Sequence, residues 1–221
     1  MIKLKEISKS YKVGPTTVRA VESVDLTIER GDMVSIVGHS GSGKTTLLSL
    51  MGGLTKPSTG RVLVDGTNIW TLSDREQSQL RNRRIGFAFQ FSSLIPTLNA
   101  IDNVRLPATF SGALVNHGRA TDLLELVGLK DRIHSLPGML SGGEQRRVAL
   151  ARTLMNNPEI ILADEPTGDL DEETEADILD IFRSINDKGV TIVIVTHSRA
   201  VASQAKKVLR MNKGHLEVNG D

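Results

Sequence analysis

The chain has 221 residues, with 27 Lys and Arg against 26 Asp and Glu and a formal net charge of +1. This balance lacks the positive excess of an electrostatic nucleic-acid binder, and an aromatic content of 3% leaves few stacking platforms for single strands. The absence of Cys excludes disulfides, thiol nucleophiles and Cys-ligated metals. No secretory leader begins the sequence, and no stretch approaches the ~20 apolar residues of a membrane helix. We therefore expect an intracellular chain that does not itself span a membrane.

The amino-terminal region predicts an antiparallel sheet followed by one buried strand. Residues 2–8 and 24–28 alternate apolar and polar side chains, as half-exposed antiparallel strands do. Residues 62–64 form a third short strand that runs into the tight turn Asp65-Gly66. Residues 33–37 are instead almost continuously apolar and rich in β-branched side chains, which indicates a strand buried on both faces of a parallel sheet.

A glycine-rich loop follows this buried strand. Its sequence, Gly38-His39-Ser40-Gly41-Ser42-Gly43-Lys44-Thr45, fits G-x-x-x-x-G-K-[ST], and a helix-like segment begins at Thr46. Glycines let successive backbone N–H groups converge on phosphate oxygens, and a helix N-terminus adds positive potential. We expect residues 38–46 to bind a nucleotide, Lys44 to reach its β- and γ-phosphates, and Thr45 to ligate Mg²⁺. A solvated glycine turn is the alternative, and the strand–loop–helix context disfavours it.

The middle of the chain predicts helices. Two capping boxes, beginning at Ser73 and Ser141, open helices over 74–83 and up to about Asn156. Between about 92 and 158 no buried-strand pattern occurs, so we expect an inserted helical subdomain there. A further helix follows Asp171, with apolar residues at 178, 181, 182 and 185, and stops at Gly189.

Two more buried strands end in residues that can do chemistry. Residues 160–163 lead into Asp164 and Glu165, and residues 190–195 lead into His197. Two adjacent carboxylates at a strand end require a nearby cation, so we expect Asp164 to bind Mg²⁺ and Glu165 to orient an attacking water as general base. A solvated acidic turn is the alternative. The predicted fold class is α/β, a P-loop NTPase core with a mostly parallel sheet, an N-terminal antiparallel β subdomain and an inserted α-helical subdomain, over 1–221 as one domain.

The segment Leu140-Ser141-Gly142-Gly143-Glu144-Gln145 resembles the signature motif of ATP-binding-cassette (ABC) ATPases. The resemblance covers essentially the whole chain, with all motifs in the family's order. It implies that Tyr11 stacks on adenine, that Gln90 follows a strand as the Q-loop glutamine and Mg²⁺ ligand, and that His197 contacts the γ-phosphate. It further implies that residues 168–171, which include Asp169, form the D-loop.

The signature segment has a physical meaning of its own. Ser141 caps a helix whose first N–H groups, at Gly142, Gly143 and Glu144, carry a partial charge of about +0.5, which makes a second anion site. The chain has one P-loop, so if it cannot bring both sites onto one nucleotide, two chains facing head to tail can. The resemblance implies this arrangement, an isologous homodimer that sandwiches ATP and opens after hydrolysis.

Three segments, residues 90–100, 103–107 and 163–171, look like the MacB/LolD/FtsE-like group. This resemblance implies a Mg²⁺-dependent ATPase subunit of a membrane ABC transporter or mechanotransmission complex, in which ATP-driven dimer closure moves a permease. The permease would dock near Gln90 and the helical subdomain, which would hold the chain at the inner face of the cell membrane. A soluble ABC-type ATPase acting on a ribosome or on DNA, and a small-molecule kinase, are the alternatives. The single cassette without a heptad array disfavours the first, and the Ser141 loop is unexplained by the second.

Overall fold

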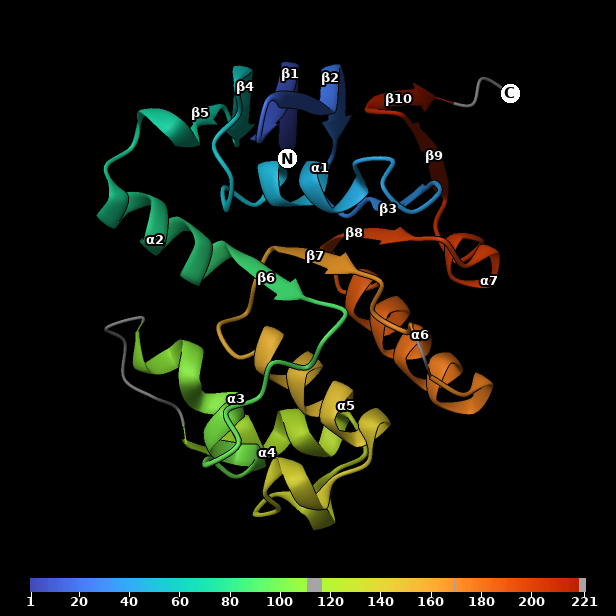
Figure 1. Cartoon of the computed structure of the whole chain (residues 1–221). Helices are drawn as coiled ribbons and strands as arrows, with labels where there is room; N and C mark the ends of the chain where they lie inside the picture. Colours follow the sequence, from blue (N-terminus) through green and yellow to red (C-terminus); the bar gives the residue numbers. More distant parts are fainter. Residues whose placement is uncertain (111–116, 169, 219–221) are drawn as a thin grey trace.

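The computed structural model describes residues 1–110, 117–168 and 170–218, and it contains two sheets (Figure 1). The upper sheet in the figure is antiparallel. Its strand order is β2 (Thr16–Ile28), β1 (Ile2–Val13), β4 (Thr59–Val64) and β5 (Thr67–Asn68). The expected Asp65-Gly66 turn joins β4 to β5, and both residues have positive φ, as a two-residue hairpin turn requires.

The second sheet forms the centre of the molecule. Its strand order is β10 (His215–Val218), β9 (Lys207–Asn212), β3 (Met33–Val37), β8 (Thr191–Thr196), β7 (Ile160–Asp164) and β6 (Ile85–Ala88). Neighbouring strands are parallel from β9 to β6, and β10 pairs with β9 in the antiparallel direction. The strands β3, β7 and β8 are buried along almost their whole length, which confirms the three fully apolar strands predicted above.

The helices separate the two sheets and cover the lower face of the central one (Figure 1). The α-helices are α1 (Lys44–Met51), α2 (Asp74–Arg84), α3 (Ala100–Thr109), α4 (His117–Leu126), α5 (Gly142–Thr153), α6 (Glu172–Asn186) and α7 (Arg199–Ala202). Three 3₁₀ turns are η1 (Ile69–Thr71), η2 (Lys130–Arg132) and η3 (Pro137–Met139). None of the helices in the described ranges is long and apolar enough to cross a bilayer.

Hydrophobic residues form a core on each face of the central sheet. One cluster joins alternate residues of β3, β7 and β8 to α1 and to the antiparallel sheet. The other joins the remaining residues of these strands to α3, α4, α5 and α6. Because successive side chains of a strand point to opposite faces, one apolar run serves both cores. Burial on both faces holds these strands in place in the sheet. It therefore fixes the position of their carboxyl ends, after which the polar residues follow.

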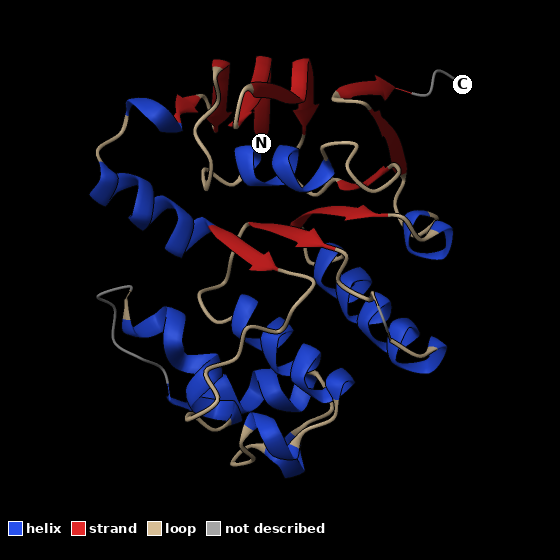
Figure 2. Cartoon of the chain, in the orientation of Figure 1, coloured by secondary structure: helices blue, strands red, loops and turns tan. Residues whose placement is uncertain are grey.

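The helices α3, α4 and α5 lie together in the lower, helical part of the molecule, apart from the strand-rich upper part (Figure 2). In sequence they fall between β6 and β7, so their position agrees with a helical insertion, while its limits at 92 and 158 stay a prediction. The end of α5 differs from expectation, because the helix stops at Thr153 rather than near Asn156. Arg119 of α4 donates to the carbonyls of Leu154 and Met155 at 2.8 Å each, just beyond the helix end, where Pro158 has no N–H to offer the Leu154 carbonyl.

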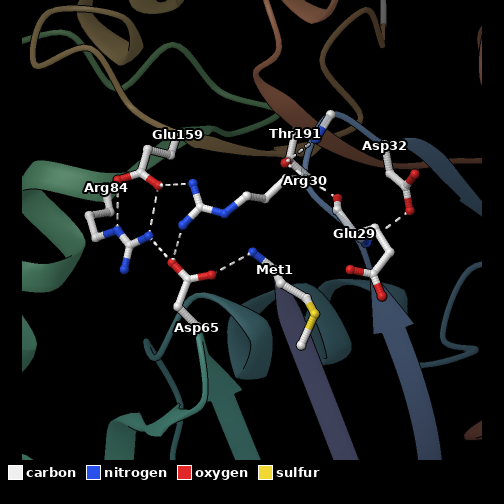
Figure 3. Close-up of polar contacts among 9 residues, drawn as sticks. Met1, Glu29, Arg30, Asp32, Asp65, Arg84, Glu159 and Thr191 are labelled. Atoms are coloured by element: carbon white, nitrogen blue, oxygen red, sulfur yellow. Dashed lines mark hydrogen bonds and ion pairs between the residues drawn. The ribbon is translucent and has the colours of Figure 1, made fainter.

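An ionic cluster ties the two sheets together at the amino ends of the central strands (Figure 3). Arg84, the last residue of α2, bonds Glu159, which precedes β7, at 2.7 and 2.9 Å and also bonds Asp65 of the antiparallel sheet. Arg30, between β2 and β3, bonds the same two carboxylates at 2.7 and 3.2 Å. The amino group of Met1 adds a contact of 3.0 Å to Asp65. Five chain segments therefore meet at the end of the sheet opposite to the polar strand ends.

Candidate functional site

The candidate site is formed where three neighbouring strands of the central sheet end. Val37 of β3 is level with Thr196 of β8, and Asp164 of β7 is level with Val195. The loop after β3, Glu165 and His197 therefore follow strands that end side by side. Ligands of open α/β sheets bind at this edge.

The loop after β3 can follow its path only with glycine at particular positions. Gly43 has a φ of 106°, and a Cβ on it would collide with the carbonyl oxygen of Ala20 in β2. A Cβ on Gly38 would collide with the carbonyl oxygen of Met211 in β9. The loop is thus held against two neighbouring strands while His39, Ser40 and Gly41 stay exposed. The last residue of the loop caps α1, whose first N–H groups point into the same place.

The helix α1 begins at Lys44, two residues before the predicted start at Thr46, so Lys44, Thr45 and Thr46 all lie in its first turn. The Lys44 ammonium is buried and donates to the carbonyls of Gly38 and His39 at 2.7 and 3.1 Å. The positive charge therefore lies directly over the loop that we expect to hold phosphates.

Thr45 and Asp164 meet from two different elements. The Thr45 hydroxyl donates to a carboxylate oxygen of Asp164 at 3.3 Å. Burial, and secondarily the neighbouring charge of Glu165, raises the pKa of Asp164 above its ordinary value, against the opposing effects of Thr45 and Lys44. A desolvated carboxylate beside a hydroxyl is a fitting place for a divalent cation, whose charge would keep the carboxyl ionised. The described residues include no cluster of three or more His, Cys, Asp or Glu that could hold a metal ion.

Both carboxylate oxygens of Glu165 are bonded to the end of β8. Oε1 lies 2.8 Å from Nδ1 of His197, and Oε2 accepts a hydrogen bond of 2.9 Å from the hydroxyl of Thr196. The Glu165 side chain is 14% exposed, whereas that of His197 is 73% exposed. The arrangement presents a fixed carboxylate and a movable imidazole at the same edge.

Gln90 follows β6 on the other side of Glu165. The amide nitrogen of Gln90 is one of the closest atoms to the place where a Cβ on Gly168 would lie, and the Glu165 carbonyl oxygen is another. Arg146 of α5 donates to the carbonyls of Glu165 and Pro166 at 3.4 Å each. The structure therefore brings Gln90 to the turn that holds Glu165, whereas Thr45 and Asp164 meet each other on the loop side. Asp169, expected in this turn, lies outside the described residues.

The signature segment lies at the start of α5, away from the start of α1 (Figure 1). Ser141 and Glu144 form the predicted capping box, with reciprocal bonds of 2.7 and 3.2 Å, and the backbone N–H of Ser141 is the first cause of the lowered pKa of Glu144. Ser141 and Gly142 are exposed, and Gly143 packs against Thr174 of α6. The chain thus places its two expected anion sites at different parts of its own fold.

Tyr11 lies on the β1–β2 hairpin, which passes the phosphate loop. It pairs with Val18, two residues before the Ala20 carbonyl that faces Gly43. The Tyr11 ring is 39% exposed and carries the ammonium of Lys9 at 5.1 Å from its centroid. An exposed ring at this place is suited to stack on a base bound beside the loop.

Thr196 and Arg146 touch Glu165 but are absent from the predicted set. For Thr196 a signal existed, because it is the last residue of a buried strand and directly precedes His197. For Arg146 none existed, because its reach from α5 to the turn after β7 depends on the packing of distant elements.

The chain is similar to known proteins over most of its length. Residues 21–168 match the ABC transporter family. The macrolide export ATP-binding/permease protein MacB of Bdellovibrio bacteriovorus is 44% identical over 98% of this chain, which spans only 33% of that relative. The lipoprotein-releasing system ATP-binding protein LolD of Legionella pneumophila is 42% identical over 96% of this chain and 94% of its own length.

A solved structure gives the same result. The ATP-binding cassette MJ0796, solved as a dimer in a post-hydrolysis state with ADP and Pi, has a TM-score of 0.92 and 41% identity, covering 100% of this chain and 97% of that one. The fold and site thus define a P-loop ATPase with the α/β architecture predicted above. The chain belongs to the ABC transporter family, as an ATP-hydrolysing ABC cassette related to the MacB and LolD ATP-binding proteins.

Proposed function

We propose that this cassette is a Mg²⁺-dependent ATPase that works as a homodimer and drives a membrane permease. The observation that carries the proposal is the convergence of a phosphate loop, a Thr–Asp pair and a fixed Glu–His pair at the ends of three adjacent strands. Thr45 and Asp164, with Gln90 as a further expected ligand, would hold Mg²⁺, which would neutralise charge on the phosphate oxygens.

The residues of the chain supply the remaining steps. Lys44 and the N–H groups of residues 38–46 bind and orient the phosphates, and Tyr11 stacks on the adenine. Glu165 accepts a proton from the water that attacks the γ-phosphorus, as the bond to the β,γ-bridging oxygen breaks and ADP leaves. His197, bonded to the same carboxylate, donates to a γ-phosphate oxygen and stabilises its charge.

The test of this chemistry is Glu165→Gln, which keeps the size of the side chain and removes the base. We expect kcat for ATP hydrolysis to fall by about 100-fold or more, with ATP affinity retained. Light scattering should then detect a dimer trapped by unhydrolysed ATP. A variant that turns over ATP near the wild-type rate would remove Glu165 from this role.

The proposed homodimer is supported by the separation of the two anion sites. The loop before α1 and the start of α5 lie at different parts of the chain (Figure 1), and MJ0796 was solved as a dimer. Ser141, Gly142, Gly143 and Glu144 of one subunit would bind the nucleotide held by the loop of the other. Ser141→Arg places bulk and charge at this contact, and we expect it to abolish ATP-dependent dimerisation while nucleotide binding to the monomer persists. Ser73→Arg, in the equivalent cap of α2, is the matched control and should dimerise normally, whereas unchanged dimers of Ser141→Arg would contradict the shared site.

The proposed membrane role rests on the relatives. MacB is named an ATP-binding/permease protein, and it is about three times as long as this chain. A separate permease would therefore complete the system for this chain. Two aromatic residues, Phe91 directly after Gln90 and Phe110 at the end of α3, are 73% and 78% exposed, which supports protein contacts at these two residues. These contacts would hold the cassette at the inner face of the cell membrane. Co-purification from solubilised membranes should recover an integral membrane protein, and recovery of ribosomes or DNA would favour the soluble alternative, which the relatives do not support.

A further inference from the structure

Thr196 is a buried polar residue that has no role in the site as described so far. It ends β8, is 1% exposed, and directly precedes His197. Its hydroxyl lies 2.9 Å from Oε2 of Glu165 and 3.0 Å from the backbone nitrogen of Ser198. A β-branched residue at the end of a strand can pack without a hydroxyl group. The packing of Thr196 therefore does not explain these two hydrogen bonds.

The direction of both bonds follows from the groups involved. The backbone N–H of Ser198 can only donate, and the ionised carboxylate of Glu165 can only accept. The single proton of the Thr196 hydroxyl must therefore point to Glu165, while a lone pair receives the N–H of Ser198. The backbone after β8 thus orients the hydroxyl, and the hydroxyl orients the carboxylate.

The Glu165 carboxylate needs this support because the backbone of Glu165 adopts an unusual conformation. Glu165 has a φ of 44°, the left-handed region that non-glycine residues rarely adopt. Main-chain bonds of 2.9 Å to Val195 and 3.1 Å from Gly168 hold this conformation. These main-chain bonds fix the backbone from which the Glu165 side chain extends. The bonds to its two carboxylate oxygens fix the orientation of the carboxylate.

The two oxygens of Glu165 are held very differently. Oε1 faces His197, whose side chain is 73% exposed, so water can compete for that contact. Oε2 faces the Thr196 hydroxyl, which is enclosed in the strand end where water cannot replace it. Of the two contacts, that of Thr196 is the one able to fix the carboxylate while the imidazole moves toward a phosphate.

We propose that Thr196 is a positioning residue for ATP hydrolysis, which holds Oε2 of Glu165 so that Oε1 takes the proton of the attacking water. The proposal rests on the proposed role of Glu165 as general base. It assigns to the last residue of β8 an effect on turnover and none on nucleotide affinity, because the Thr196 hydroxyl bonds the carboxylate of Glu165 and the backbone of Ser198.

The test compares Thr196→Val, which keeps the shape and removes the hydroxyl, with Thr196→Ser, which keeps the hydroxyl. In steady-state ATPase assays of the full chain, we expect Thr196→Val to lower kcat about tenfold with KM within about twofold of wild type. Thr196→Ser should recover kcat to within about threefold of wild type. Thr191→Val is the matched control, because Thr191 begins the same strand, is 2% exposed, and bonds only backbone groups, so its kcat should stay at the wild-type value.

Two results would overturn the proposal. The first is a Thr196→Val enzyme with kcat within about twofold of wild type, and the second is a Thr196→Ser enzyme as slow as Thr196→Val. If Thr196→Val melts below the assay temperature, Thr196→Ala is held to the same two criteria at a temperature where it is folded. Glu165→Gln is assayed alongside: if it keeps its turnover the proposed function fails, and if it is inactive while Thr196→Val is fast only the present inference fails.

Discussion

Replacing Asp65 by Asn removes a charge from the cluster that joins the two sheets (Figure 3) while preserving the size of the side chain. Asp65 receives bonds from Arg84 and Arg30, and these arginines also bond Glu159 in front of β7. The substitution leaves two guanidinium groups with one carboxylate between them. We therefore expect the antiparallel sheet to be held less firmly against the central one, with a lower free energy of unfolding.

The size of the effect follows from the pKa of Asp65. Its hydrogen bond from Arg84, above all, lowers this pKa from 3.8 to about 2, against an opposing effect of burial. Each pKa unit corresponds to about 1.36 kcal/mol, so the difference corresponds to about 2.4 kcal/mol for the ionised group. The side chain is 25% exposed, and screening by solvent reduces the stabilisation to about 1.5 kcal/mol.

The direction in which the stabilisation by Asp65 changes with pH is the decisive test of a charge effect. A carboxyl whose pKa is lowered by folding stabilises the folded state above its unfolded pKa of 3.8, and this stabilisation disappears as the pH falls through about 2. The difference in unfolding free energy between wild type and Asp65→Asn should therefore be full at pH 7 and fall to about half at pH 3.

Urea unfolding followed by circular dichroism at both pH values measures this difference. Asp131→Asn, at an exposed aspartate outside the cluster, is the control and should change stability by less than about 0.5 kcal/mol. A loss for Asp65→Asn that is the same at pH 7 and pH 3 would refute the charge-based reasoning. The cause would then be packing or the neutral hydrogen bonds.

Three further substitutions test other contacts. Gly43→Ala should abolish nucleotide binding and lower the melting temperature strongly, whereas Gly41→Ala, where a Cβ has free space, should cost only about 1 kcal/mol of backbone strain. Ser35→Ala should raise the free energy of unfolding by about 1 kcal/mol in urea titrations, because the buried hydroxyl has no partner among the described residues. Arg152→Met should lower the free energy of unfolding by about 1 to 2 kcal/mol, because the half-buried guanidinium donates to the carbonyls of Ser92 and Ser93 at 2.7 and 2.9 Å. Arg152→Lys should recover little of the loss.

The sequence was sufficient for elements whose signal is local. The three buried strands could be predicted because both faces of β3, β7 and β8 are enclosed, which makes their sequences continuously apolar. The capping boxes at Ser73 and Ser141 are contacts within four residues, so the pattern of side chains is also the pattern of bonds. The helix after the glycine-rich loop could be predicted from the same kind of local pattern, although it begins at Lys44, two residues before the predicted Thr46.

Contacts between distant segments could not be predicted in this way. The cluster around Arg84 joins residues 19 and 75 positions apart, and no local pattern marks Asp65 or Glu159 as its partners. The bonds from Arg119 of α4 to the carbonyls that follow α5 join residues 35 and 36 positions apart, and no local pattern marks them either. Such pairings exist only after the sheets and helices have packed.

The helix α5 shows why these long-range contacts matter for the chemistry. Its first turn carries Ser141, its second turn reaches the carbonyl of Glu165 through Arg146, and Arg152 in its last turn holds the loop that follows Gln90. A rigid helix moves all three contacts together, since its backbone bonds leave little freedom within it. If the proposed permease displaced the loop after Gln90, the displacement would therefore reach Ser141 and the carboxylate of Glu165, the proposed general base, through one element. Under this argument, Arg152→Met should weaken the stimulation of ATPase activity by the permease more than it weakens basal turnover.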